Sequence, residues 1–292
     1  MTKPPTTAET LEPELPLTVY HRLSRRDASL KDALEHTIGS VIAHRWHILQ
    51  TFKRDFTSQS NLTRGGALWN YILPLVPLGA YVLLMAMRLF PSFGAVNAVV
   101  YITFGVTLYF LFSGLVRIPI TVLEGQFSSL SKSNTPIISA TIASVSQLMF
   151  ETLIRSALVI VVFIAFQGAP SWHVIFIIPL LPCAMLLFFS LGIILAQFNL
   201  AYRDVAKIVS IVLTYGLFFS NVIFPMGNGP VITQILSFNP FYIFIENCRG
   251  LAIGAPLVHV NSLIGFGCLS VMMFLIAVRL TYRAELRLRG WV

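Results

Sequence analysis

Charged residues are scarce in this sequence. They make up 11% of its 292 residues, whereas 56% are hydrophobic and the mean hydropathy is +0.78. A soluble domain has about 25% charged residues, so the composition argues against an ordinary soluble protein. The apolar residues also form long uninterrupted blocks rather than periodic stripes, which is typical of helices that cross a lipid bilayer. We therefore expect a membrane protein that crosses the bilayer several times.

Motifs for catalysis and metal binding are missing as well. The three cysteines, Cys183, Cys248 and Cys268, have no CxxC spacing, so we expect neither a disulfide framework nor a metal site. The sequence has no HExxH motif and no His–carboxylate cluster in any apolar block. A GxxxxGK[ST] phosphate-binding loop is also absent. We expect no catalytic or cofactor-binding residues, and any ATP and Mg²⁺ would be bound by a separate polypeptide.

The uncharged blocks predict an all-α protein with six membrane-spanning helices. Each block is long enough to cross a bilayer, and the third is interrupted by Glu151 and Arg155. The predicted spans cover residues 65–87, 89–116, 136–167, 172–198, 208–225 and 250–278. The apolar stretch 231–245 is too short to cross, so we expect a re-entrant or interfacial segment between spans five and six, on the side opposite the N-terminus.

The positions of the basic residues agree with six spans. Of the 20 Lys and Arg, all except Arg88, Arg155 and Arg249 fall on the side of the N-terminus. By the positive-inside rule, we expect both termini to be cytoplasmic. We also expect the membrane to be the bacterial inner membrane. A crossing at 231–245 would put the four C-terminal arginines outside. The net charge of +8 is explained by this bias, so we expect no nucleic-acid partner.

The two ends of the chain differ from the apolar middle. Residues 1–29 predict a disordered or loose cytoplasmic tail. From Leu30 to Phe52 apolar residues recur at spacings of three and four, which predicts an amphipathic interface helix in a segment 30–64 that ends in an elbow. A soluble helix packed on a partner would show the same pattern. The six-helix domain covers 65–281, and 282–292 form a basic cytoplasmic tail.

A charged pair within a span requires a reason, because a charge at a helix centre costs about 2.5–3.5 kcal/mol on insertion scales. Glu151 precedes Arg155 by four residues, the favourable order for a pair on one helix face. The pair is either structural, at a helix contact, or functional, on a polar path or at a lipid phosphate. Several aromatic side chains belong to the interfacial belt or core, or line a conduit in which rings stack on sugars. The candidate conduit or substrate contacts are Tyr71, Tyr81, Tyr109, Phe110, Glu151, Arg155, Tyr215, Phe218, Phe219, Glu246 and Arg249.

From about residue 45 onward, the chain resembles the type-2 ABC exporter permeases for polysaccharides. The resemblance depends on motifs whose order and spacing match that family. They are Lys53-Arg-Asp-Phe56, Gly66-Ala-Leu-Trp69, Ile72-Leu-Pro-Leu75, Met149-Phe-Glu-Thr-Leu153, Leu200-Ala-Tyr-Arg-Asp-Val205, Phe224-Pro225, Phe238-Asn-Pro240 and Glu246-x-x-Arg249. The chain departs from the family at residues 57–65, where relatives have an Arg- and Tyr-rich stretch.

The resemblance implies a homodimeric permease that is not itself an enzyme. Its partners would be two copies of a separate ABC ATPase subunit, a lipid-linked polysaccharide of O-antigen or capsule type, and periplasmic export machinery. The candidate ATPase-docking residues are Lys53, Arg54, Asp55, Glu124, Lys132, Tyr202, Arg203 and Asp204. Two alternatives remain: a membrane-embedded glycosyl- or acyltransferase of envelope glycan assembly, and a type-2 ABC permease for a drug or another lipid.

Overall fold

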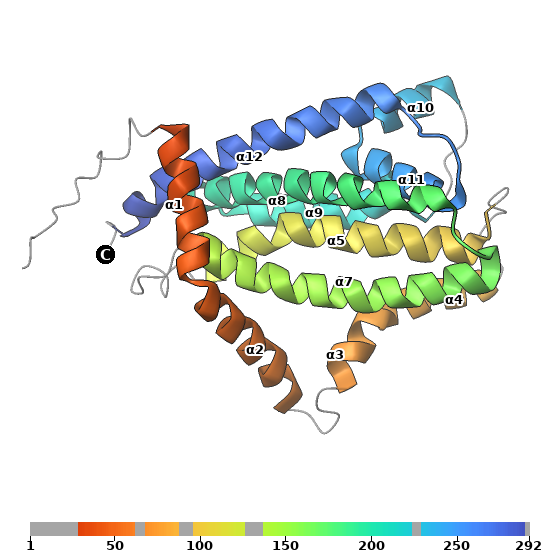
Figure 1. Ribbon diagram of the computed structural model, residues 1–292, viewed down its shortest axis with the longest axis horizontal. Helices are drawn as coiled ribbons and strands as arrows, with labels where there is room; N and C mark the ends of the chain where they lie inside the picture. Colours follow the sequence, from red (N-terminus) through yellow and green to blue (C-terminus); the bar gives the residue numbers. More distant parts are fainter. Residues whose placement is uncertain (1–28, 62–67, 88–95, 126–136, 224–228, 290–292) are drawn as a thin grey trace, which may run out of the picture.

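The computed structural model describes residues 29–61, 68–87, 96–125, 137–223 and 229–289 (Figure 1). Within these ranges the chain is helical and contains no β-strand. The fold expected from the sequence is therefore confirmed at the level of an all-helical protein. The predicted tail 1–29 lies almost wholly outside the described residues, as do Lys132 and residues 62–64 at the end of the predicted elbow.

Four helices of the described part are long and apolar enough to cross a membrane. They are α5 (Ala98–Gly125), α7 (Ile137–Gln167), α8 (Ile177–Ala201) with the 3₁₀ turn η2 (Trp172–Phe176) before it, and α12 (Val260–Arg289). Helix α5 lies at the centre, packed on α7 and on α8, and α12 packs on the other side of α8 (Figure 1). This position explains why α5 is mostly buried, whereas most residues of the other three spans are partly or fully exposed.

We name the two ends of this bundle by the residues that lie there. The basal end is where α5 and α8 finish, at Gly125 and Ala201, and the apical end is where α5 begins, at Ala98. The backbone N–H of Asn97 donates to the side-chain oxygen of Gln167 (3.1 Å), so α7 finishes at the apical end. Helices α5, α7 and α8 therefore alternate in direction, as expected for consecutive spans.

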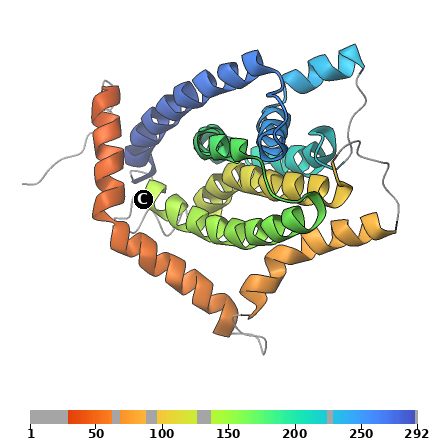
Figure 2. The ribbon, with the colours of Figure 1, turned by 45° about the vertical axis from the view of Figure 1, so that its right-hand side comes forward.

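The N-terminal helices surround one side of the bundle (Figure 2). They are α1 (Leu30–Ala43), α2 (Arg45–Asn61), α3 (Leu68–Ile72), the 3₁₀ turn η1 (Leu73–Leu75) and α4 (Val76–Ala86). Helix α1 packs on α12 and α2 packs on α7. The single helix expected over residues 30–52 is divided at His44, whose ring Nδ1 donates to the backbone oxygen of Ser40 (2.8 Å). This capping contact ends α1 and lets α2 turn toward α7.

Three further helices cover the apical side of the bundle or run beside it: α9 (Asp204–Phe219), α10 (Pro230–Ser237) and α11 (Pro240–Ile253). The side-chain oxygen of Asn239 accepts hydrogen bonds from the N–H groups of Phe241 and Tyr242 and so caps α11. Gly254 ends α11 in the left-handed conformation at φ 79°, which glycine adopts without strain. Two short helices with a sharp turn thus occupy the stretch expected to contain a re-entrant segment.

The predicted spans agree with the helices to different degrees. Spans three and four coincide with α7 and η2–α8 within a few residues. Helix α5 continues past Arg117, where the second span was expected to end, because this exposed side chain does not interrupt the helix. The last span begins at Val260 rather than at residue 250, since residues 250–253 belong to α11. In the regions of spans one and five, α4 and α9 have 11 and 16 residues.

Candidate functional site

The basal end brings together two segments that are 75 residues apart in the chain. Asn199, which is buried near the end of α8, donates from Nδ2 to Glu124 Oε2 on α5 (3.5 Å). Its Oδ1 accepts from the backbone N–H of Ala206 (2.9 Å), in the first turn of α9. The first N–H groups of a helix have no partner in the helix itself, so this contact fixes where α9 starts. Asn199 thus joins α5, α8 and α9.

The predicted docking residues next to this junction face outward. The chain leaves the helical conformation at Tyr202 (φ −134°), whose side chain is 70% exposed. Lys207 Nζ and Asp204 Oδ1 are 3.5 Å apart, and both side chains are about four-fifths exposed. Such a surface pair contributes little stability, so both groups are available to a partner. Glu124 and the loop of Tyr202, Arg203 and Asp204 form one surface.

The other predicted docking residues lie elsewhere. Lys53 and Arg54 are exposed on α2, and Asp55 belongs to the same helix. Helix α2 packs mainly on α7, whereas the Glu124 junction joins α5, α8 and α9. The structure therefore does not place Lys53, Arg54 and Asp55 in the surface formed by α8 and α9.

The charged pair within α7 is formed in the structure. Arg155 Nη2 donates to Glu151 Oε2 (3.2 Å), and the Arg155 guanidinium lies over the ring of Phe110 on α5, 5.2 Å from its centre. Arg155 is buried and Glu151 is partly exposed. The arrangement neutralises two charges at the contact between α5 and α7, which agrees with the structural interpretation and leaves the functional one untested.

A second charged pair lies at the apical end, within α11. Arg249 is only 2% exposed and donates from Nη1 to Glu246 Oε2. Its guanidinium carbon is 3.5 Å from the centre of the Tyr101 ring on α5, a cation–π distance. No described residue accepts a hydrogen bond from Arg249 Nε or Nη2. A Cβ at Gly105 would come within 2.5 Å of Nη2, so the guanidinium needs a glycine beside it.

Tyr101 extends this apical cluster to the end of α9. Its hydroxyl donates to the backbone oxygen of Asn221 (2.9 Å), and Asn221 itself adopts a positive φ of 54°. Asn239 Nδ2 donates to the hydroxyl of Ser220 (3.0 Å). The N-terminal part of α11 is therefore tied to the end of α9, and its middle is tied to α5. These contacts fix the segment that follows α9 against the bundle.

The predicted conduit aromatics divide into buried and exposed groups. Tyr109 is buried and donates to the backbone oxygen of Leu213 on α9, and Phe110 lies beside Arg155. Tyr71 packs edge-on against Phe150 of α7, and Tyr81 is partly buried on α4. On α9, Tyr215, Phe218 and Phe219 are exposed. A single chain therefore does not gather these rings around one channel.

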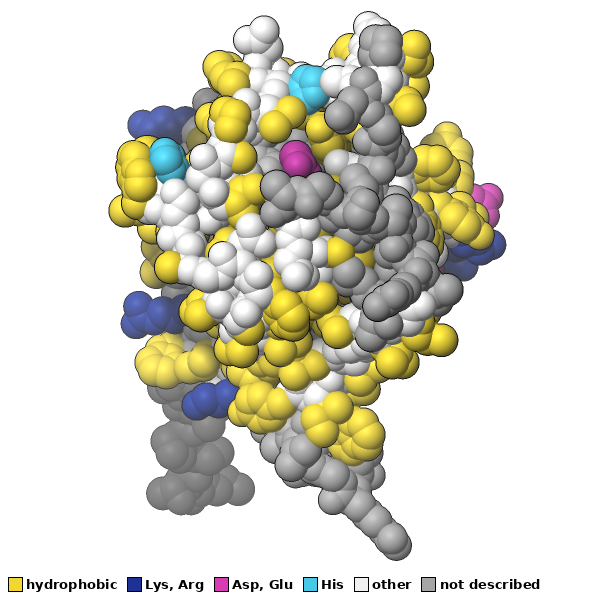
Figure 3. Space-filling model, turned by 90° about the vertical axis from the view of Figure 1, so that its right-hand side faces the viewer, with side chains coloured by type: hydrophobic (Ala, Val, Ile, Leu, Met, Phe, Trp, Pro, Cys, Tyr) yellow, Lys and Arg dark blue, Asp and Glu magenta, His cyan; other side chains and the backbone are white. Residues whose placement is uncertain are grey.

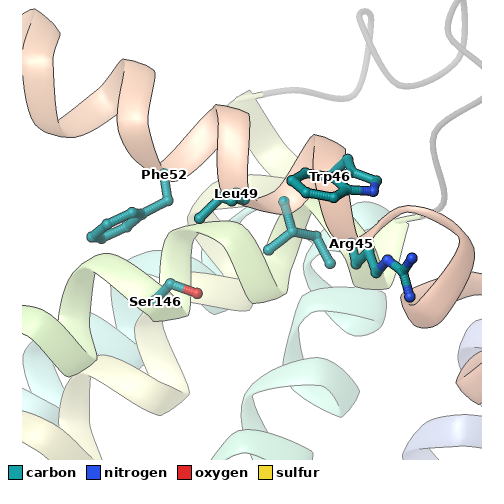
Figure 4. Close-up of a pocket in the computed structure, with 6 residues that line it drawn as sticks. Arg45, Trp46, Leu49, Phe52 and Ser146 are labelled. Carbon is teal, nitrogen blue, oxygen red and sulfur yellow. The ribbon is translucent and has the colours of Figure 1, made fainter.

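Two pockets lie between the described helices. The first has a volume of about 710 Å³ and lies at the apical end. It is bounded by the start of α8, the α11–α12 connection and the start of α12, and its lining includes Leu180, Cys183 and Leu263. The other, of about 420 Å³, lies between α2 and α7 (Figure 4). Among the described side chains that Figure 3 colours by type, most are hydrophobic, and the basic ones lie at the edges of the apical face. Both pockets suit apolar chains better than free sugars.

Sequence reasoning missed the residues that join these sites. Asn199 could have been noticed because it directly precedes the Tyr-Arg-Asp loop and is polar at the end of an apolar block. Tyr101 and Gly105 carry no local signal, since they match many other positions of the apolar blocks. Their importance comes from Arg249, nearly 150 residues away in the chain, which only the fold places beside them.

Comparison with known proteins gives relatives of low identity. No family model matches the chain. An O-antigen export system permease protein, RfbA of Myxococcus xanthus, is 22% identical over 240 residues, which are 81% of this chain and 91% of that protein. Nodulation protein J of Azorhizobium caulinodans is 30% identical over 131 residues, 44% of this chain and 52% of that protein. Nodulation protein J of Rhizobium leguminosarum bv. viciae is 29% identical over 126 residues, 42% and 49% of the two chains.

Proposed function

We propose that this chain, a relative of the type-2 ABC exporter permeases, is the transmembrane subunit of an ATP-driven exporter of a lipid-linked polysaccharide, of O-antigen or capsule type. The observation that carries the proposal is the similarity to an O-antigen export permease over 91% of that protein's length. A match of that extent relates the whole arrangement of spans rather than one apolar helix. The all-helical bundle with four candidate membrane spans is consistent with it.

The six-span topology is part of this proposal. Spans one and five would be supplied by the region of α3, η1 and α4 and by α9, in addition to the four long helices. Helices α10 and α11 would form a periplasmic re-entrant segment, because they return to the bundle at the end where α9 finishes. The basal end would then be cytoplasmic and the membrane the bacterial inner membrane, in agreement with the bias in basic residues.

The ATPase subunit would dock at the basal end. Glu124, Asn199 and the start of α9 form one connected unit there, next to the exposed side chains of Tyr202, Asp204 and Lys207. A push on this surface would reach α5, α8 and α9 together, because Asn199 joins all three. ATP and Mg²⁺ would be bound by the partner subunit. Hydrolysis of ATP by the purified chain alone would contradict this division of labour.

The exposed face of α9 supports a homodimer. Ile208, Ile211, Val212 and Tyr215 recur at helical spacing and are each more than half exposed, whereas Leu213 and Leu217 pack inward. A conduit for a glycan would form between two copies, which accounts for the absence of a gathered aromatic channel in one chain. Cysteine at position 211 is expected to cross-link two copies in membranes, and cysteine at the buried position 213 is expected not to. A monomer with no cross-link from either position would contradict the dimer.

Deletion of the gene followed by assay of surface polysaccharide tests the cargo. Loss of surface glycan, with lipid-linked glycan accumulating inside the cell, is the expected result. Normal surface glycan without internal accumulation would refute the proposal. Among the described residues, no group of three or more His, Cys, Asp or Glu could hold a metal ion, and Asp204 pairs with Lys207 at the surface. The alternative of a membrane-embedded transferase thus gains no support from the structure.

A further inference from the structure

The pocket between α2 and α7 is lined by apolar side chains together with one basic side chain. One face of α2 supplies Ile48, Leu49 and Phe52 to its wall, together with Arg45 and Trp46 at the start of the helix, and Ser146 of α7 lines the opposite side (Figure 4). The lining residues Arg45, Ile48, Leu49 and Phe52 recur at spacings of three and four, so they share one face of α2. Phe52, the last of these residues, contacts Phe150 of α7 edge-on, with ring centres 6.3 Å apart.

The polar groups that line this pocket indicate which kind of ligand would complement it. The Ser146 hydroxyl donates to the backbone oxygen of Ile142 in its own helix (2.9 Å), so the α7 side requires no polar ligand. No acidic side chain is among the lining residues, and Arg45 is the cation among them. The apolar volume and the guanidinium therefore match a molecule with a long apolar chain and an anionic head.

The position of the pocket indicates where such a molecule would come from. Arg45 and Trp46 lie where α1 joins α2, and α1 contacts the basal half of α12 through the rings of His36 and Tyr282 (5.0 Å between centres). Trp46 is 66% exposed next to the guanidinium. An exposed Trp beside a basic residue is typical of the level of lipid head groups, and the apolar side chains of Ile48, Leu49 and Phe52 continue the pocket wall from there.

We infer that the α2–α7 pocket binds an anionic glycerophospholipid of the surrounding bilayer, with its phosphate at Arg45 and an acyl chain along Leu49 and Phe52. The lipid fills the space that separates α2 from α7 and so sets the angle at which the N-terminal helices lie against the bundle. The acyl chain exchanges one apolar environment for another, so its transfer from the bilayer contributes little to the affinity. Arg45 supplies the preference for an anionic head group. The site does not depend on what the protein exports.

Trp46 provides a direct reporter of occupancy. In the full chain, Trp69, Trp172 and Trp291 are replaced by Phe, so that Trp46 is the single remaining tryptophan. The purified protein in detergent is titrated with phosphatidylglycerol or phosphatidylcholine whose acyl chains carry bromine, which quenches tryptophan fluorescence. We expect saturable quenching by both lipids, with a midpoint about fivefold lower for phosphatidylglycerol, the factor that one basic residue contributes at an anionic surface.

Three variants separate the contributions. Arg45→Gln is expected to abolish the difference between the two lipids, while Lys31→Gln, a matched loss of charge at an exposed pair on α1, keeps it. Ser146→Phe fills the pocket and is expected to weaken quenching by both lipids, in protein that elutes as a single species of unchanged size. Equal midpoints in the unaltered pocket, or the same loss with Lys31→Gln, would overturn the inference. Loss of quenching as the chain self-associates would show that a second copy covers the pocket, and would overturn it as well.

Discussion

Gly192 on α8 lies directly against the backbone of α5. A Cβ at this position would be 2.6 Å from the backbone oxygen of Leu115, 2.7 Å from that of Val116 and 2.9 Å from the Val116 Cα. All three atoms belong to the backbone of α5, so no side-chain rotation can make room. In membranes, small residues at helix contacts allow this close packing, which replaces the hydrophobic driving force of soluble cores.

Gly192→Ala is therefore expected to destabilise the bundle. Ordinary contacts begin near 3.4 Å, so the helices must move apart by roughly 0.5–1 Å along their contact. Overpacking of this kind costs about 1–3 kcal/mol, and more when the backbone must shift. The better helix propensity of Ala returns about 1 kcal/mol at most. We expect a net loss of unfolding free energy, and a thermal midpoint that is lower by several degrees.

The buried thiol of Cys248 on α11 can report this unfolding. In a chain with Cys183 and Cys268 replaced by Ala, a thiol-reactive dye labels Cys248 only when the fold opens. Gly265→Ala on α12 is the matched control, because a Cβ there meets no atom within 4 Å. It is expected to keep or raise the midpoint. A midpoint for Gly192→Ala equal to or above that of Gly265→Ala would refute the close packing of α5 on α8.

Three further predictions concern the polar contacts. Glu246→Gln leaves Arg249 buried without its countercharge, at a cost of about 3–5 kcal/mol, so the rate of Cys248 labelling should rise. The exposed-pair control Lys207→Gln should leave this rate unchanged. Equal labelling rates in the two variants would show that the Glu246–Arg249 ion pair does not hold α11. Replacement of both Glu151 and Arg155 by Leu should lower the thermal midpoint less than Arg155→Leu alone. The single change leaves the Glu151 carboxylate without its countercharge among apolar side chains. Additive losses of stability would contradict a coupled pair. Asn199→Ala should lower export-coupled ATP hydrolysis in the assembled complex. The control is Ser237→Ala on α10, which also removes a hydroxyl that donates to the backbone of its own helix. Unchanged coupling in Asn199→Ala would show that the basal junction does not transmit motion.

Much of the architecture was predictable from the distribution of charge. Long uncharged blocks determine which segments can enter a bilayer, so α7 and η2–α8 agree with the expected spans within a few residues. The ends of other helices were less predictable, because a charge such as Arg117 does not end a helix that continues beyond the apolar layer. Helix α11 begins after the Asn239 cap and ends at Gly254. These are local signals that a count of apolar residues does not include.

The sequence by itself determined that this is an all-helical membrane protein and that Glu151 and Arg155 can pair. These properties depend on composition and on spacings within one helix. Only the tertiary structure decided that Arg249 lies on Tyr101 beside Gly105, that Asn199 joins Glu124 to α9, and that α2 leaves a pocket against α7. Such contacts join residues far apart in the chain. They depend on how helices cross, and the crossing is set by packing rather than by any local pattern.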